Sequence, residues 1–140
     1  MSDISSLLVE VQQALAAKNI AHAQQLIDQL KIDSPEDPDA RYFSCLLLRL
    51  QGKYSEALPS LLALTQDFPD HARALQETAT VSLALNEPKR AYQSAERAVT
   101  LDPSLLQCWQ YLIPLRQKFD EARANAAVAQ VEFLRSLPSE

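Results

Sequence analysis

The chain has 140 residues, of which 47% are hydrophobic, and it carries a formal net charge of -5. This length fits one ordinary domain with enough apolar residues to bury a core. The single glycine argues against glycine-rich phosphate loops and tight hairpins, and the excess of acidic over basic residues (18 against 13) argues against nucleic-acid binding, which needs a basic face.

The N-terminal half predicts two pairs of helices. In the first pair, Val11, Ala14 and Leu15 recur at three- and four-residue steps, as on one face of a helix, and a break follows at Lys18 and Asn19. Asn19 suits the cap of the next helix. In the second pair, the break falls at Gly52, which suits the left-handed position after a helix, and Pro59 predicts a slight kink early in the second helix.

The C-terminal half continues the pattern less regularly. The third pair breaks at Asn86, which suits a helix cap as Asn19 does, and Pro88 is acceptable in the first turn of the next helix. In the fourth, Pro114 is expected to interrupt the first helix, and residues 119–122 predict the start of the second. We therefore expect a divergent repeat or capping pair at the end of the chain.

A common 34-residue period links these pairs. Four columns share it, and each holds a proline, an alanine or an aliphatic residue: Pro35, Pro69 and Pro103; Ala23, Ala57 and Ala91; Ile27, Leu61 and Ala95; Leu30, Leu64 and Ala98. The prolines stop each second helix, because proline lacks an N–H and disfavours helical geometry just before it. The small alanine column would let neighbouring helices approach closely.

These residues resemble the tetratricopeptide repeat (TPR) family, whose 34-residue pattern runs Trp-x2-Leu-Gly-x2-Tyr, Ala-x3-Phe, Pro. Trp109 and Leu112 match the first block, although Ile113 and Arg116 replace its Gly and Tyr. Ala122 comes three positions before the place that a full period after Ala91 would give, which indicates a three-residue shortening or a shifted turn. The resemblance implies an all-α, right-handed α-solenoid of about three helix-turn-helix repeats (about 4–37, 38–71 and 72–105) with a divergent fourth repeat or capping helix pair (about 106–137), in a single domain over 1–140.

In this family, the first helices of the repeats line a concave groove. The resemblance therefore implies a partner-binding groove with an apolar N-terminal half and a polar C-terminal half. Its residues would be Leu8, Val9, Gln12, Tyr42, Phe43, Leu46 and Arg49, followed by Arg73, Gln76, Glu77, Thr80, Gln110 and Tyr111. Apolar anchors beside a polar strip suit a peptide or an amphipathic helix of another protein.

An alternative interpretation assigns part of this set to the core. Val9, Phe43 and Leu46 would then be ordinary packing between repeats, with Tyr42 covering them.

Some TPR domains hold the C-terminal carboxylates of chaperones in a basic clamp. The corresponding positions here are Leu8, Gln12, Phe43, Arg73 and Glu77, so that only Arg73 keeps its positive charge and Glu77 would repel a carboxylate. The sequence therefore argues against this clamp.

No residue pattern indicates catalysis, a metal or a cofactor. His22 and His71 fall near predicted helix starts and are expected to be solvated or capping. The acidic run over residues 33–39 lacks the glycine and closing glutamate of a calcium loop, and the basic residues are dispersed rather than gathered in a phosphate-binding stripe. We expect a chain that is not an enzyme, with no catalytic, cofactor or metal site.

The N-terminus and the cysteines indicate the cellular compartment. The first residues show no secretory signal, and the longest apolar run, residues 45–48, is far shorter than the roughly 20 residues of a membrane span. Cys45 and Cys108 have no metal-ligand spacing and read as buried reduced thiols. We expect a cytoplasmic protein without membrane insertion.

The favoured function is that of a non-catalytic adapter or scaffold that binds a protein or peptide. Two alternatives stay open. The chain could be the N-terminal docking or regulatory domain of a larger enzyme, such as a sulfotransferase-like bacterial transferase. It could also be a self-associating module, a possible homodimer formed through the last helix, where Ala126, Ala129, Phe133 and Leu134 lie on adjoining faces.

Overall fold

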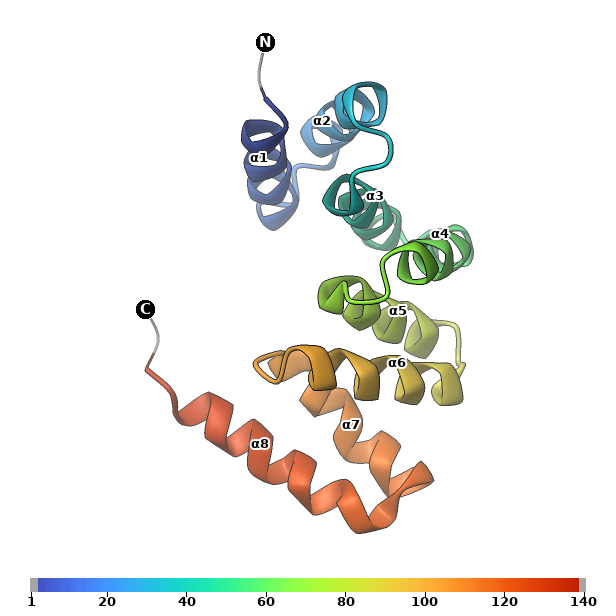
Figure 1. Cartoon of the computed structure of the whole chain (residues 1–140), viewed down its shortest axis with the longest axis vertical. Helices are drawn as coiled ribbons and strands as arrows, with labels where there is room; N and C mark the ends of the chain where they lie inside the picture. The colour runs from blue at the N-terminus through green and yellow to red at the C-terminus, as the bar shows by residue number, and fades with distance from the viewer. Residues whose placement is uncertain (1–2, 139–140) are drawn as a thin grey trace. The chain divides into compact units, whose positions relative to one another are not determined.

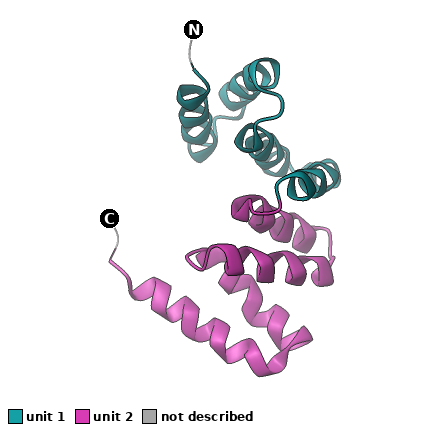
Figure 2. Ribbon diagram, viewed as in Figure 1, with its two compact units in different colours: residues 1–68 teal, residues 69–140 magenta. Residues whose placement is uncertain are grey.

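The computed structural model describes residues 3–138 and contains, over these residues, eight α-helices, one short 3-10 helix and no strand (Figure 1). The predicted all-α helical-repeat fold class is confirmed. The chain divides into two compact units, residues 1–68 and 69–140 (Figure 2). The division into four repeats of one domain remains our proposal.

Unit 1 contains two helix pairs, α1 (Ile4–Ala16) with α2 (Ile20–Asp33), and α3 (Pro38–Leu50) with α4 (Tyr54–Asp67). α3 packs on α4 and also contacts both α1 and α2. The core comes from the apolar stripe of each helix: Leu7, Val11, Leu26, Ile27, Leu30, Phe43, Leu47, Leu61 and Leu64. Ala23 and Ala57 are fully buried in it, where their small side chains allow close helix packing.

Unit 2 repeats this arrangement with α5 (Ala72–Ala84), α6 (Pro88–Leu101), α7 (Leu106–Phe119) and α8 (Ala124–Ser136), and a 3-10 turn, η1 (Glu121–Arg123), precedes α8. α6 packs on α5 and α7, and α7 packs on α8. The core cluster comprises Leu75, Ala79, Ala95, Ala98, Val99, Cys108, Leu112 and Ala127.

The helix boundaries follow the 34-residue period. The first helix of each pair begins at Ile4, Pro38, Ala72 and Leu106 in turn. Within the first three pairs, the turn has a residue with positive φ at the same repeat position: Lys18, Gly52 and Asn86, at 57°, 76° and 59°. At Gly52, the amides of residues 52 and 53 bond to the carbonyls of residues 49 and 48, as in a Schellman turn. The predicted left-handed role of Gly52 is confirmed.

Polar side chains cap several helices. The Asn19 carboxamide oxygen accepts a hydrogen bond from the His22 amide at 3.3 Å, so the predicted cap is confirmed. Asn86, by contrast, forms the left-handed turn and Glu87 is the N-cap residue of α6. His71 Nδ1 accepts from the Ala74 amide at 3.1 Å at the start of α5, which is one of the two roles expected of the histidines.

The last pair departs from the expectation at two points. Pro114 does not interrupt the helix, since α7 runs from Leu106 through Phe119. The second helix does not start at residues 119–122 either, because Ala122 is exposed in the 3-10 turn. The first buried alanine of α8 is Ala124, one position before the place that a full period after Ala91 would give. α8 itself begins two positions after the place that a full period after Pro88 would give, so the turn is shifted and the repeat is not shortened by three residues.

Among the described residues, no helix has the length and apolar content needed to cross a membrane.

Candidate protein-binding faces

In unit 1, the predicted groove residues lie on α1 and α3, which contact each other. Leu8, Leu46 and Arg49 are half-buried, and Gln12 is exposed. Val9 is 55% exposed and, at 100° per residue, points away from the buried stripe of α1. Val9 is therefore not part of the core.

The two aromatic members of the set are buried. Tyr42 and Phe43 are 8% and 6% exposed, with their ring centroids 5.3 Å apart. Both rings thus belong to the packing of α3, as the alternative interpretation expects of Phe43. The predicted residues that remain at least partly accessible on this side of unit 1 are Leu8, Gln12, Leu46 and Arg49.

In unit 2, α5 is buried over most of its circumference. It leaves one strip accessible, in which Arg73 and Leu83 are exposed and Gln76 and Thr80 are half-buried, at the spacing of one helix face. Three of these four residues were predicted for the groove. Glu77, which was also predicted, follows Arg73 by four residues and so lies next to it on α5, but it is buried at 4% exposure.

Hydrogen bonds join the strip on α5 to α7. The Thr80 and Tyr111 hydroxyls are 2.9 Å apart, and the Cys108 thiol donates to Gln76 Oε1 at 3.5 Å. Gln110 and Tyr111 are half-buried beside them. The structure therefore brings Gln76, Thr80 and Tyr111 together as a polar row on one face of unit 2, which we call the α5/α7 face.

Cys108 lies beneath this row, and burial raises the pKa of its thiol to about 12, with the nearby Asp102 carboxylate adding to the effect. Such a thiol stays protonated and is a poor nucleophile or metal ligand at neutral pH. Cys45 is also buried, and neither cysteine is in a disulfide. No group of three or more His, Cys, Asp or Glu side chains in the described part of the chain could hold a metal ion.

A charged network on the other side of unit 2 was not predicted. Arg116 of α7 is buried and donates to both carboxylate oxygens of Glu96 on α6, at 2.6 and 3.2 Å. Arg123 binds Glu96 at 2.9 Å and Asp120 at 3.1 Å, and these hydrogen bonds raise the pKa of Arg123. The only available signal was Arg116 in the place of the TPR tyrosine. The network fixes α6, α7 and η1 together.

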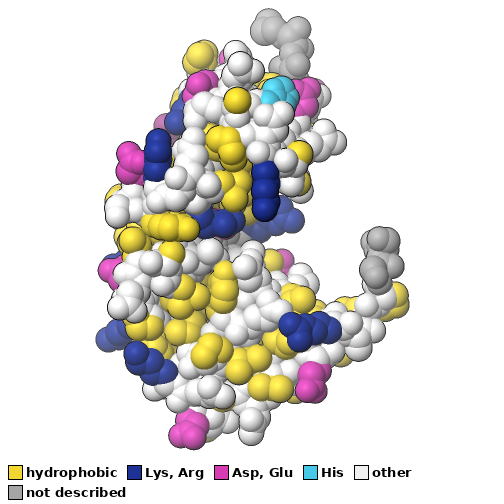
Figure 3. Space-filling model, turned by 180° about the vertical axis from the view of Figure 1, so that it is seen from behind, with side chains coloured by type: hydrophobic (Ala, Val, Ile, Leu, Met, Phe, Trp, Pro, Cys, Tyr) yellow, Lys and Arg dark blue, Asp and Glu magenta, His cyan; other side chains and the backbone are white. Residues whose placement is uncertain are grey.

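The basic side chains do not form a phosphate-binding strip on the face of unit 2 that Figure 3 shows, where Lys and Arg lie at separate positions. Several are instead engaged in ion pairs, such as Arg90 with Glu87 at 3.4 Å. This distribution is that of a mixed-charge solvated surface.

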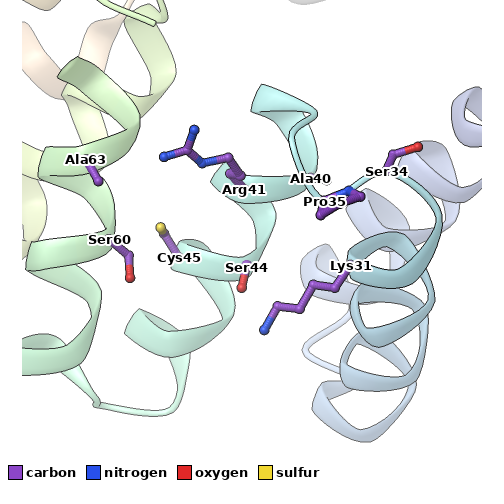
Figure 4. Close-up of a pocket in the computed structure, with 9 residues that line it drawn as sticks. All are labelled: Lys31, Ser34, Pro35, Ala40, Arg41, Ser44, Cys45, Ser60 and Ala63. Atoms are coloured by element: carbon purple, nitrogen blue, oxygen red, sulfur yellow. The ribbon is translucent and has the colours of Figure 1, made fainter. Parts of the chain in front are cut away.

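A cavity in unit 1 was not foreseen from the sequence. It has a volume of about 320 Å³ and lies over α3, between α2 and α4. Figure 4 shows Lys31 extending from α2 toward α3, while Arg41 and Cys45 point from α3 toward α4. We call this cavity the α3 trough; it is lined by Lys31, Ser34, Pro35, Ala40, Arg41, Ser44, Cys45, Ser60 and Ala63.

Known structures share this fold. MamA (residues 41 to the end) from Desulfovibrio magneticus RS-1 is 24% identical with a TM-score of 0.74, and the match covers 98% of this chain and 78% of that one. A MamA RS-1 double mutant gives the same identity and score over 99% and 79%. Naa15/Naa10 bound to HypK-THB is 17% identical with a TM-score of 0.80 over 94% of this chain but 20% of the other.

No family model matches the chain, and no curated protein matches it. The structural matches establish a TPR-like helical-repeat fold, in agreement with the resemblance found in the sequence.

Proposed function

We propose that the chain is a non-catalytic protein-interaction module that binds a peptide or helix of a partner protein. The observation that carries this proposal is the α5/α7 face. α5 is covered almost everywhere except along Arg73, Gln76, Thr80 and Leu83, and this strip is continued on α7 by Tyr111. A row of neutral polar groups with one apolar end can hold the backbone of a bound segment and bury one of its side chains.

A further observation supports the proposal. One solved structure of similar fold is a complex, Naa15/Naa10 bound to HypK-THB, so a helical scaffold of this kind occurs in a protein assembly. On unit 1, we propose that Leu8, Gln12, Leu46 and Arg49 form the corresponding face.

We keep the cytoplasm as the proposed location, since Cys45 and Cys108 are buried without a disulfide.

A matched pair of variants tests the α5/α7 face. Leu83 lies on the face and is 37% exposed, whereas Leu101 lies at the end of α6 and is 40% exposed. Affinity purification with quantitative mass spectrometry would compare Leu83→Lys with Leu101→Lys. We expect partners that are retained by wild type and Leu101→Lys and lost by Leu83→Lys. An identical set of partners for all three proteins would contradict the proposal.

Self-association is a second candidate because α8 exposes an apolar stripe. Ala126, Ala129 and Phe133 share one side of this helix and are exposed, Phe133 at 56%, whereas Leu134 is half-buried. A solution mass of twice 15.6 kDa by light scattering, reduced to 15.6 kDa by Phe133→Glu, would support a homodimer through α8. A monomeric wild type would exclude a stable dimer.

A further inference from the structure

The α3 trough carries hydrogen-bond donors that the described part of the protein leaves unused. Lys31 Nζ and the hydroxyls of Ser34 and Ser44 make no hydrogen bond or ion pair there. Arg41 is already engaged: Nη1 binds Asp67 at 2.9 Å, and the guanidinium lies 5.9 Å from the centroid of the Phe68 ring. Figure 4 shows Lys31 and Ser44 extending to the same side of α3, whereas Arg41 extends toward α4 and Ser34 points away from them. Lys31 and the Ser44 hydroxyl are therefore the donors that one ligand could share.

No acidic residue lines the trough, although unit 1 is acidic. Residues 1–68 contain nine Asp and Glu and five Lys and Arg, and two of these five cations are Lys31 and Arg41. Asp67 compensates the charge of Arg41, which it binds at 2.9 Å, so Lys31 supplies the uncompensated positive charge of the trough. At physiological ionic strength the Debye length is about 8 Å, so more distant carboxylates are largely screened from a group bound beside Lys31. The charge at Lys31 favours a negatively charged ligand.

Unit 2 shows how the same space is closed by side chains. Arg41 and Ser44 of α3 correspond to Trp109 and Leu112 of α7, two repeat periods further along the chain. Leu112 is fully buried there, and the Trp109 indole packs against the core cluster. In unit 1, a charged and a small side chain occupy these positions, and a cavity results.

The backbone at the proline that follows α6 in unit 2 also has contacts that differ from those at its counterpart after α2 in unit 1. The Pro103 carbonyl accepts from Trp109 Nε1 at 2.9 Å and from Gln130 Nε2 at 3.4 Å. Pro35, its counterpart, lines the open trough. α2 and α3 also contact each other less extensively than α6 and α7 do.

We propose that the α3 trough binds a carboxylate side chain from an acidic segment of a partner protein. Lys31 would pair with the carboxylate, Ser44 would donate a hydrogen bond to it, and Pro35 and Ala40 would contact the methylene groups of the side chain. The site is separate from the face of α3 that carries Leu46 and Arg49, from which it is turned by roughly 100° around the helix.

NMR titration of the full chain tests the site with three probes: a blocked hexapeptide of alternating Glu and Ala, the same peptide with Gln for Glu, and inorganic phosphate. We expect the Glu peptide to shift the amide signals of the trough residues and the Gln peptide to leave them unchanged. Lys31→Glu should weaken the binding of the Glu peptide roughly tenfold or more, because one charge-assisted interaction is lost and a repulsive charge is added.

Two further variants make the result specific. Lys89 is exposed on α6, and Lys89→Glu changes the net charge by the same amount as Lys31→Glu but should leave binding of the Glu peptide unchanged. Ser44→Leu fills the trough with the residue that unit 2 has at Leu112, and should abolish binding without changing charge, with folding checked by thermal denaturation. Each of three results would overturn the proposal. The Glu peptide could leave the amide signals unchanged, or Lys31→Glu and Lys89→Glu could weaken its binding equally. The trough could also bind inorganic phosphate but not the Glu peptide.

Discussion

The two units have the same helix spacing and different interiors. In unit 2, the space between α6 and α8 contains Trp109, above which the Arg116 guanidinium lies 5.1 Å from the ring centroid, and Arg116 is in turn held by Glu96. In unit 1, the equivalent space between α2 and α4 is the α3 trough. The Arg41–Asp67 ion pair lies at this trough, and its carboxylate is 57% exposed.

This difference shows that a helical repeat can keep its backbone while one copy is closed and another is open. The closed copy uses an aromatic ring and a buried ion pair, both of which stabilise the contact between helices. The open copy uses short and charged side chains, which stabilise little but leave binding groups accessible. Substitutions at equivalent positions of the two copies measure how much stability this difference represents.

The largest effect is expected from Arg116→Ala. This change leaves Glu96 with only the exposed Arg123 as a partner and removes the donor to the Arg123 carbonyl, so the free energy of unfolding should fall by about 3 to 5 kcal/mol. Denaturant unfolding followed by circular dichroism measures it. Arg97→Ala, on the exposed side of α6, should change stability by less than about 0.5 kcal/mol. Equal effects of the two substitutions would show that the network contributes nothing.

Trp109→Ala compares the two units directly. Removing the indole opens a cavity and leaves the Pro103 carbonyl without this donor, so the free energy of unfolding should fall by about 3 kcal/mol. This value is at the lower end of the range for a large aromatic residue because Trp109 is half-buried. Arg41→Ala, at the equivalent position of unit 1, should cost at most about 1 kcal/mol, since it removes a partly exposed ion pair. Similar losses at both positions would refute the contrast between a closed and an open copy.

Ala57→Phe probes the close packing on α4. Ala57 is fully buried, so a phenyl ring should overpack the helix contact and cost about 1 to 3 kcal/mol. Ala63, on the same helix, is exposed at the edge of the trough, and Ala63→Phe is expected to be nearly neutral. Thermal melts of both variants test this. A melt of Ala57→Phe identical to that of wild type would contradict the assigned packing.

The last effect is absent at neutral pH and appears only at alkaline pH. Burial raises the pKa of Cys108 from 9.0 to about 12, so the folded state keeps this proton where the unfolded chain loses it. The stabilising contribution of the neutral thiol is complete below pH 9 and is lost as the pH rises toward 12. Subtracting the pH dependence of Cys108→Ala from that of wild type isolates it. A difference that stays constant between pH 8 and pH 11 would argue against the raised pKa.

Much of the local structure could be predicted from the sequence. The 34-residue period gives the starts of the first helices, and Asn19, Gly52 and Pro88 fulfil the roles that their own chemistry dictates: an amide oxygen that caps, a residue without Cβ at φ of 76°, and a ring that fixes φ in a first turn. These are local preferences of the backbone, and they require no knowledge of the neighbouring helices.

The candidate site was predictable only in part. Gln76, Thr80 and Tyr111 do share a face, because positions one repeat apart lie on adjacent helices. Tyr42, Phe43 and Glu77 are buried, and a helical period alone does not distinguish a side chain beside a face from one within it. Ala122 was assigned to the last helix because the 3-10 turn before α8 shifts the alanine pattern without leaving a motif.

The sequence by itself determined the 34-residue period, most of the helix ends and the alanine contacts, since these depend on spacing and backbone preferences. Only the tertiary structure decided that Trp109 and Arg116 fill the space between helices in unit 2, while Lys31, Arg41 and Ser44 leave its counterpart in unit 1 open. The reason is physical: whether a space between helices is filled depends on the combined volume and charge of side chains that are far apart in the chain.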